Sequence, residues 1–197
     1  MNICRYFLSF AVFSFIGWAY ETVYYTIQQK KIINSGFLST CFCPIYGIGA
    51  LLDLLLLGRI ENTFVLFVAG MIVTGVLEYF VSHLLESLFA RRWWDYTGWP
   101  LNINGRICII SVMMFGLGTV ALIKCIAPFT FGMIDGMSNI AVYALAVIIA
   151  FVMIVDAVKS VRNMDTDKLW YVEKQSEVVE ELENSAVVQK IKSVLRR

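Results

Sequence analysis

The sequence predicts an all-α membrane protein, a polytopic bundle of apolar helices that cross a lipid bilayer. Three observations lead to this fold class. Hydrophobic residues make up 59% of the 197 residues and charged residues only 16%, whereas soluble domains contain roughly 45–50% apolar and 25% charged residues. The mean hydropathy of +0.72 agrees with this composition. The apolar residues also gather in runs close to the ~20 residues that a helix needs to span the hydrocarbon core.

Five segments are candidates for membrane-spanning helices. Four of them are long apolar runs, at residues 6–27, 63–90, 107–125 and 140–158. The second segment in chain order is less regular, because its unbroken apolar run covers only residues 45–57. Starting at Gly36 extends it to 22 residues, with Pro44, Gly47 and Gly49 expected to bend or break the helix. We expect about five transmembrane helices, with four plus a re-entrant segment at 36–57 as the alternative.

The lysine and arginine residues predict the orientation of the chain, since cytoplasmic loops are enriched in them. With five spans and an external amino terminus, 13 of the 16 basic residues lie inside, and with four spans and both termini inside, 12 do. Both topologies leave the C-terminus in the cytoplasm. We therefore expect a multi-pass protein of the cell membrane with a cytoplasmic tail. The charge count does not distinguish the two topologies, and the length of the second segment favours five spans.

The chain is expected to divide into a transmembrane domain at residues 1–160 and a cytoplasmic tail at residues 161–197. The tail is expected to form an amphipathic helix. Acidic residues dominate its first part, and Lys190, Lys192, Arg196 and Arg197 close it, which complements the helix macrodipole. Three roles remain open: a solvated helix that lies against the protein's own loops, a docking surface for a cytoplasmic partner, or a basic end that rests on anionic lipid.

Polar residues interrupt two of the apolar segments. Glu21 lies near the end of the first, and Glu78 lies in the third, followed by Ser82, His83 and Glu86. Ionisable side chains are costly in lipid and are therefore functional candidates. Glu78, Ser82 and Glu86 share one helix face. Five spans would bring Glu21 and Glu78 near the same membrane face and four would not, while His83 is interpreted first as a hydrogen-bonded packing residue.

The segment RRWWDYTGWPLNINGRICII, residues 91–110, places unusual polar chemistry between two apolar helices. Its donors could bind the buried carboxylates and form a polar pocket at the inner face. These donors are Arg91, Arg92, Asn102, Asn104, Arg106 and the backbone at Gly105. The alternative is that its tryptophans are interfacial anchors, its arginines topology signals and NING a turn. The candidate substrate-binding or pathway residues are Glu21, Tyr46, Glu78, His83, Glu86, Asp95, Asn102, Asn104 and Arg106.

Other classes of site are disfavoured. The five cysteines contain no C-x-x-C and the chain has one histidine, so we expect neither a metal site nor another cofactor. The near-zero net charge of +1 gives no reason to expect nucleic acid as a partner. The expected partners are membrane lipids, a separate ATPase subunit and a second copy of the chain.

Four motifs resemble a bacterial membrane family labelled putative ABC-transporter type IV, or putative ABC transporter permease. They are GWAYET, NSGFLSTCFCPIYGIGA, LEYFVSHLLE and RRWWDYTGWPLNINGRICI, and the resemblance covers residues 17–118. It implies a permease subunit that works with a separate ATPase, in line with the absence of G-x-x-x-x-G-K-[ST] from this chain. The E-A-A…G signature that many importer permeases present to their ATPase is also absent, so coupling would fall to residues 91–106 or the tail.

Three functional hypotheses follow from the residues and the resemblance. A transporter subunit would use broken helices and buried carboxylates to line a pathway. An intramembrane enzyme or binding protein would hold a lipid or isoprenoid phosphate headgroup at the inner leaflet, with arginines on the phosphate and Glu78 or Glu21 as base. An accessory protein would use the same polar residues only to tie helices together. Transport is the leading hypothesis, and the substrate cannot be read from the sequence.

Overall fold

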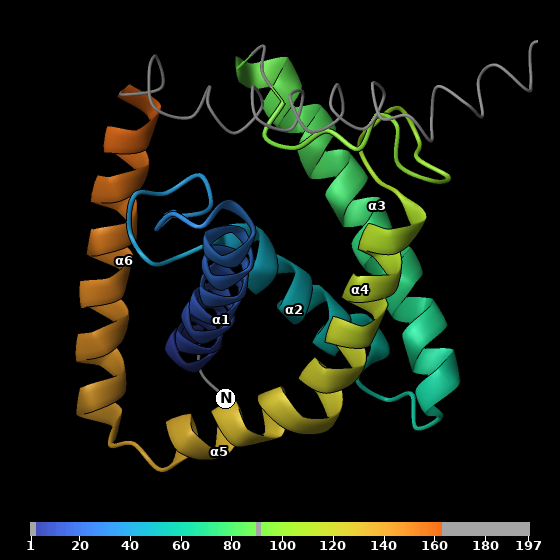
Figure 1. Ribbon diagram of the computed structural model, residues 1–197. Helices are drawn as coiled ribbons and strands as arrows, with labels where there is room; N and C mark the ends of the chain where they lie inside the picture. Colours follow the sequence, from blue (N-terminus) through green and yellow to red (C-terminus); the bar gives the residue numbers. More distant parts are fainter. Residues whose placement is uncertain (1–2, 90–91, 163–197) are drawn as a thin grey trace, which may run out of the picture. The chain divides into compact units, whose positions relative to one another are not determined.

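The computed structural model describes residues 3–89 and 92–162, and these residues form helices joined by loops, without a β-strand among them. Arg91 and residues 163–197, which contain nearly all of the predicted tail, lie outside this part of the chain. Figure 1 shows the elements. They are α1 (Ile3–Gln29), α2 (Pro44–Leu57), α3 (Thr63–Phe89), α4 (Ile109–Ala121), the π-helical turn η1 (Leu122–Ile126), α5 (Ala127–Asp135) and α6 (Asn139–Arg162).

Four helical stretches in the described residues are long and apolar enough to cross a membrane, at Ile3–Ile27, Thr63–Phe89, Ile109–Asp135 and Asn139–Arg162. At 1.5 Å per residue, the shortest of these is roughly 36 Å long, more than the ~30 Å of a hydrocarbon core. Many of their large apolar side chains are exposed, such as Phe64 (73%) and Phe151 (68%). Such surfaces are stable against lipid and costly in water. The predicted all-helical membrane fold is confirmed.

The second apolar segment differs from the predicted 22-residue span. Residues 36–43 form a loop, and α2 begins only at Pro44. Proline lacks the N–H group of a helix interior and disfavours helix at the preceding residue, but it fits the first helical turn. The loop is fastened to α1, because the N–H of Cys43 donates to the carbonyl of Ser14 at 3.0 Å. The described residues therefore have four long helices and one shorter apolar helix of 14 residues, so the second segment is shorter than the 22 residues that favoured five spans over the alternative of four.

The fourth predicted span is longer than expected. It was predicted to end at Cys125, but the helical residues continue through η1 and α5 to Asp135. The helix axis changes direction between α4 and α5 (Figure 1). A π-helical turn widens the hydrogen-bond ladder locally, and Pro128 removes one donor in the next turn. Both causes of a bend therefore lie at this point of the chain.

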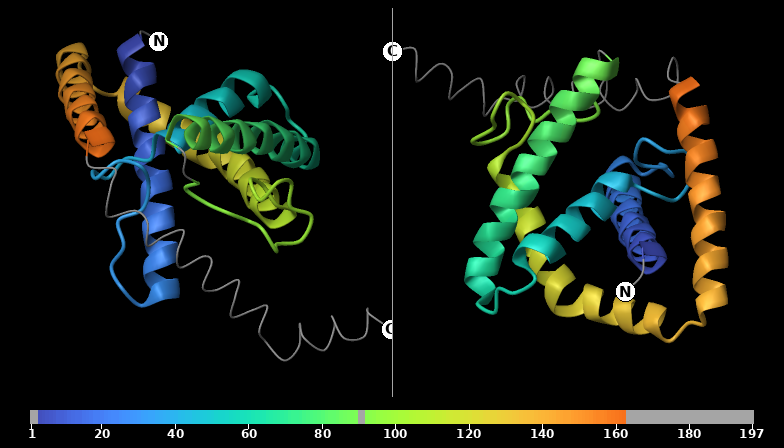
Figure 2. Two further views of the ribbon diagram at one scale, coloured as in Figure 1. Left: turned by 90° about the horizontal axis from the view of Figure 1, so that it is seen from above. Right: turned by 180° about the vertical axis from the view of Figure 1, so that it is seen from behind.

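The described residues divide into two compact units. The larger contains residues 3–77 and 112–162, and the smaller contains residues 78–89 and 92–111. In the larger unit the first turns of α1 pack on α5 and α6 (Figure 2), where Leu8 contacts Ile134 and Val142. Arg5 fastens this corner by donating to the carbonyl of Ile134 at 2.9 Å and to Asp135 at 2.7 Å.

Glycines allow the helices of the larger unit to approach closely. A Cβ atom at Gly17 would overlap the ring of Tyr46, and one at Gly47 would overlap the side chains of Ser14 and Phe10. Between α3 and α4, a Cβ atom at Gly70 would lie 2.6 Å from Thr119. Small residues at helix contacts are typical of membrane bundles, where close packing replaces the hydrophobic effect between helices. These contacts bring polar side chains of different helices within hydrogen-bond distance.

Candidate functional site

The loop after α3, residues 92–108, is folded by its own hydrogen bonds. The N–H of Tyr96 donates to the carbonyl of Gly105 at 2.7 Å, and Ile103 pairs with Ile107 in an isolated antiparallel bridge. The backbone turns back at Asn104 (φ 52°) and Gly105 (φ 67°), in the left-handed region that asparagine and glycine tolerate best. The NING sequence is therefore a turn, as one of the two sequence interpretations held, and it shapes the polar cluster of the smaller unit.

The first carboxylate of that cluster, Glu78, is only 4% exposed. It accepts a hydrogen bond from the hydroxyl of Tyr96 at 3.0 Å and another from the hydroxyl of Ser111 at 3.1 Å. Glu78 thus joins α3, the loop and the first turn of α4. Sequence reasoning named neither Tyr96 nor Ser111 as a partner, because a tyrosine in a loop and a serine in an apolar helix carry no signal of their own.

The second carboxylate, Glu86, binds both described arginines of the loop. Arg92 Nε lies 2.9 Å from Oε1, and Arg106 Nη2 lies 2.5 Å from Oε2. Arg106 also donates to Ser82 at 3.4 Å and stacks 5.7 Å from the ring centroid of Tyr79. The hydrogen bond to Glu86 raises the pKa of the Arg92 guanidinium. The helix face that the spacing of Glu78, Ser82 and Glu86 defined is the face on which the loop packs.

Asp95 and Asn102 are engaged mainly within the loop. Asp95 Oδ1 accepts hydrogen bonds from the N–H of Thr97 at 2.9 Å and from its hydroxyl at 2.5 Å, and it lies 3.7 Å from Arg92. Asn102 accepts from the N–H of Gly105 at 3.1 Å. The hydrogen bonds of these two candidate residues therefore stabilise the loop itself, and they do not include the carboxylates of α3.

Asn104 joins the loop to α3, because its side-chain amide donates to the hydroxyl of Tyr79 at 3.0 Å. The backbone carbonyl of Asn104 accepts from Arg92 at 3.2 Å. His83 lies apart from these contacts: its side chain is exposed, and its carbonyl accepts from Ser87 at 2.8 Å. The structure therefore brings Asn104 and Arg106 to the carboxylate face of α3 and leaves His83 outside. The loop cluster is defined as Glu78, Ser82, Glu86, Arg92, Tyr96, Asn104, Arg106 and Ser111.

A second polar centre lies in the larger unit, around Glu21. One carboxylate oxygen accepts from the hydroxyl of Ser35 at 2.5 Å and the other from the hydroxyl of Tyr46 at 2.8 Å. Glu21 belongs to α1, Ser35 to the loop that follows, and Tyr46 to the first turn of α2. The close approach at Gly17 positions the tyrosine ring. We call Glu21, Ser35 and Tyr46 the Glu21 centre. Glu21 belongs to the larger unit and Glu78 to the smaller one, so the predicted location of both near the same membrane face stays a prediction.

Two further acidic residues of the larger unit are buried. Asp53 and Asp156 lie near helix ends, but they are only 2% and 5% exposed. Asp156 accepts from the N–H of Thr40 at 2.8 Å and from its hydroxyl at 2.7 Å, which fastens the loop before α2 to α6. Asp53 Oδ2 lies within hydrogen-bond distance of the hydroxyl of Thr119, at 2.6 Å. Helix packing, which position along one helix does not reveal, buries both.

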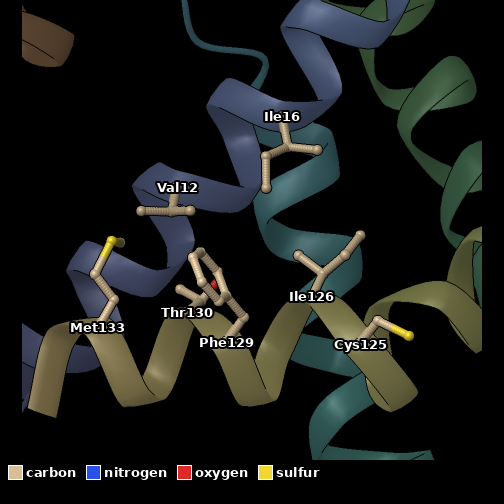
Figure 3. A pocket seen from close by; sticks show the side chains of 7 residues that line it. All are labelled: Val12, Ile16, Cys125, Ile126, Phe129, Thr130 and Met133. Carbon is tan, nitrogen blue, oxygen red and sulfur yellow. The ribbon is translucent and has the colours of Figure 1, made fainter.

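A cavity of about 360 Å³ lies in the larger unit, away from the Glu21 centre, and is lined almost entirely by apolar side chains. Figure 3 shows Val12 and Ile16 of α1 facing the side chains of η1 and α5. The residues on that side are Cys125, Ile126, Phe129, Thr130 and Met133. The groove contains none of the charged candidate residues. Among the described residues, no group of three His, Cys, Asp or Glu side chains is arranged to hold a metal ion.

The chain was compared with known protein families, curated proteins and solved structures. A family model described as putative ABC-transporter type IV matches residues 8–161 of the chain. The match covers more than half of the 197 residues, and it is longer than residues 17–118, in which the motifs lie. No curated protein and no solved structure matches the chain. The resemblance predicted from the sequence motifs is confirmed.

Proposed function

Because the chain belongs to the putative ABC-transporter type IV family, we propose that it is a membrane-embedded permease subunit that works with a separate ATPase. The observation that carries the proposal is the Glu21 centre. There the loop between α1 and α2, residues 30–43, leads into a short helix beside an intramembrane carboxylate. Substrate sites of transporters are typically built from such discontinuous segments, whose freed backbone groups and carboxylates contact the cargo.

The loop after α3, residues 92–108, is the proposed surface that couples the permease to the ATPase. The loop is attached to the end of α3 by the ion pairs of Glu86 with Arg92 and Arg106. Its outer surface carries apolar side chains, with Leu101 79% and Ile103 53% exposed. A loop with exposed apolar side chains that is ion-paired to a long helix is suited to docking a partner, because exposed apolar patches favour association. The second proposed docking segment, residues 165–197, lies outside the described residues.

The proposed orientation places the C-terminus and the loop cluster in the cytoplasm of a bacterial cell, where an ATPase can reach both. It rests on the distribution of lysine and arginine, with either 13 or 12 of the 16 basic residues on that side. Labelling of single introduced cysteines in intact cells tests it. A membrane-impermeant maleimide is expected to label a cysteine at position 59 and not one at position 102, whether the chain has five spans or four. The reverse pattern would refute the orientation.

Purification of the amino-terminally tagged chain from its native membrane in mild detergent tests the proposed partnership, with mass spectrometry of the proteins and lipids that accompany it. A stoichiometric ATPase subunit is the expected result. Leu101→Asn and Ile103→Asn are expected to reduce its recovery, and asparagine suits the positive φ of 49° at Leu101. The matched control is Ile32→Asn, an isoleucine that is 89% exposed on another loop. Loss of the ATPase only when residues 163–197 are removed would refute the loop as the coupling surface.

One observation favours a second candidate function, the binding or processing of a lipid or isoprenoid phosphate headgroup. Arg92 and Arg106 bring two guanidinium groups to one carboxylate, Glu86, at the end of an apolar helix. Guanidinium groups bind phosphate in a bidentate manner, but a phosphate would have to compete with Glu86 for both. A chain that purifies without an ATPase and with one defined phospholipid or prenyl phosphate would favour this candidate over the permease.

A further inference from the structure

A second intramembrane carboxyl, Asp53, is isolated among apolar side chains. It interrupts the sequence LLDLLLL of α2 and is 2% exposed. One turn earlier on the same helix, Ala50 packs in a cluster with Phe13, Leu122 and Ala127. Asp53 Oδ2 contacts Thr119, while the buried Oδ1 has no hydrogen-bond partner among the described residues. An ionised carboxylate with one oxygen unsatisfied in such surroundings would cost several kcal/mol.

Among the described residues, no cation compensates this carboxyl. Residues 63–77 of α3 and residues 112–121 of α4 contain no charged side chain. Lys124 of η1 donates to the carbonyl of Glu61 at 3.0 Å. On α1, Arg5 is paired with Asp135 and Glu21 binds Ser35 and Tyr46. The ion pairs formed between residues of the described ranges do not include Asp53.

The hydroxyl of Thr119 indicates where a proton lies. Thr119 Oγ1 is 2.6 Å from Asp53 Oδ2 and 3.1 Å from the carbonyl of Phe115. A hydroxyl has one hydrogen and cannot donate to both oxygens at full strength. If Oδ2 carries a proton, it donates to Thr119, and Thr119 donates to Phe115. Both contacts are then hydrogen bonds, and the unpartnered Oδ1 is the carbonyl oxygen of a neutral acid.

The packing of α3 supports this arrangement. Gly70 lies so close to Thr119 that a Cβ atom there would be 2.6 Å from both Thr119 Cβ and Oγ1. The threonine side chain is held between α2 and α3 and is 2% exposed. Its hydroxyl is therefore kept within reach of the carboxyl and shielded from water, which would otherwise satisfy Oδ1.

We propose that Asp53 is a proton-binding site of the larger unit, with Thr119 as its hydrogen-bond relay to the carbonyl of Phe115. Asp53 is protonated at neutral pH, and release of its proton requires either water or a cation to reach Oδ1. A membrane protein that moves a proton-coupled cargo needs a carboxyl of this kind. The assignment does not depend on an ATPase partner, so it can fail or succeed independently of the proposed function.

Infrared difference spectroscopy of the full chain in lipid vesicles tests the protonation state. The spectrum of the wild type minus that of Asp53→Asn at neutral pH is expected to contain the carbonyl band of a protonated carboxyl. Thr119→Val, which keeps the carboxyl and removes its hydroxyl partner, is expected to shift that band to higher frequency. The two bands of an ionised carboxylate in place of the carbonyl band would overturn the proposal, as would a carboxylate signal that responds to sodium but not to potassium.

A carbodiimide provides a second measurement on the wild type alone, so it does not depend on the folding of a variant. The reagent adds to a protonated carboxyl: the acid proton passes to a carbodiimide nitrogen, and the carboxyl oxygen bonds the central carbon before rearrangement to a stable N-acylurea. Dicyclohexylcarbodiimide is expected to modify Asp53, with a rate that falls as pH rises. The internal control is Asp156, a buried carboxyl that accepts two hydrogen bonds from Thr40. Equal modification of Asp156 and Asp53 would overturn the assignment.

Discussion

Replacement of Gly17 by alanine tests the closest contact between α1 and α2. A Cβ atom at Gly17 overlaps the Cγ, Cβ and Cδ2 atoms of Tyr46. These atoms lie at the base of the tyrosine side chain, so the ring cannot escape by a small rotation, and α2 must move. Overpacking of this kind costs about 1–3 kcal/mol. Displacement of Tyr46 also weakens its 2.8 Å hydrogen bond to Glu21.

Gly118 is the matched control, because a Cβ atom there meets nothing within 4 Å. Both glycines lie in helices, so alanine contributes a similar gain in helix propensity, roughly 0.5–1 kcal/mol, at each position. The difference between the two variants therefore isolates the clash, and we expect Gly17→Ala to be less stable than Gly118→Ala by about 1–3 kcal/mol.

The assay is reversible unfolding of the purified chain in mixed micelles, followed by far-ultraviolet circular dichroism as the fraction of denaturing detergent rises. The midpoints of wild type, Gly17→Ala and Gly118→Ala are compared at one protein concentration. Equal stability of the two variants would mean that α1 and α2 do not pack at Gly17, and the geometry of the Glu21 centre would then be wrong.

Three further predictions concern single substitutions, whose effects on stability are measured in the same unfolding assay. Tyr46→Phe removes a donor to the half-buried carboxylate of Glu21 and is expected to cost about 1–3 kcal/mol. Gly105→Ala is expected to cost at least about 1–2 kcal/mol, because alanine is strained at a φ of 67° and its Cβ would overlap Asp95. His83→Ala is expected to change stability by less than about 0.5 kcal/mol, since the side chain is exposed.

Each of these predictions has a result that contradicts it. For the tyrosine, the comparison is Tyr24→Phe, at a residue 47% exposed on α1, and an equal effect of both variants would exclude a special contribution of the Glu21 hydrogen bond. For the glycine, an unchanged midpoint would mean that the NING turn has a different backbone conformation. For the histidine, a large destabilisation would place its side chain in a contact that the exposed position excludes.

The sequence alone determined the fold class and the main helices. Hydrophobic runs of about 20 residues can be satisfied in lipid only by helices, because no water is present to bind free backbone groups. The third and last spans were therefore predicted within four residues of their observed bounds. The common face of Glu78, Ser82 and Glu86 followed from helix periodicity, which is a local property of the chain.

Tertiary structure decided which groups meet. The partners of Glu78 are Tyr96 and Ser111, 18 and 33 residues away in the chain, and a hydroxyl in a loop or an apolar helix gives no local signal of such a contact. The shortening of the second span depended on where the loop at residues 36–43 is fastened to α1. The burial of Asp53 depended on Thr119, 66 residues later. Periodicity and composition act over a few turns of helix, whereas partner choice depends on how separate helices pack, and only the folded chain determines that.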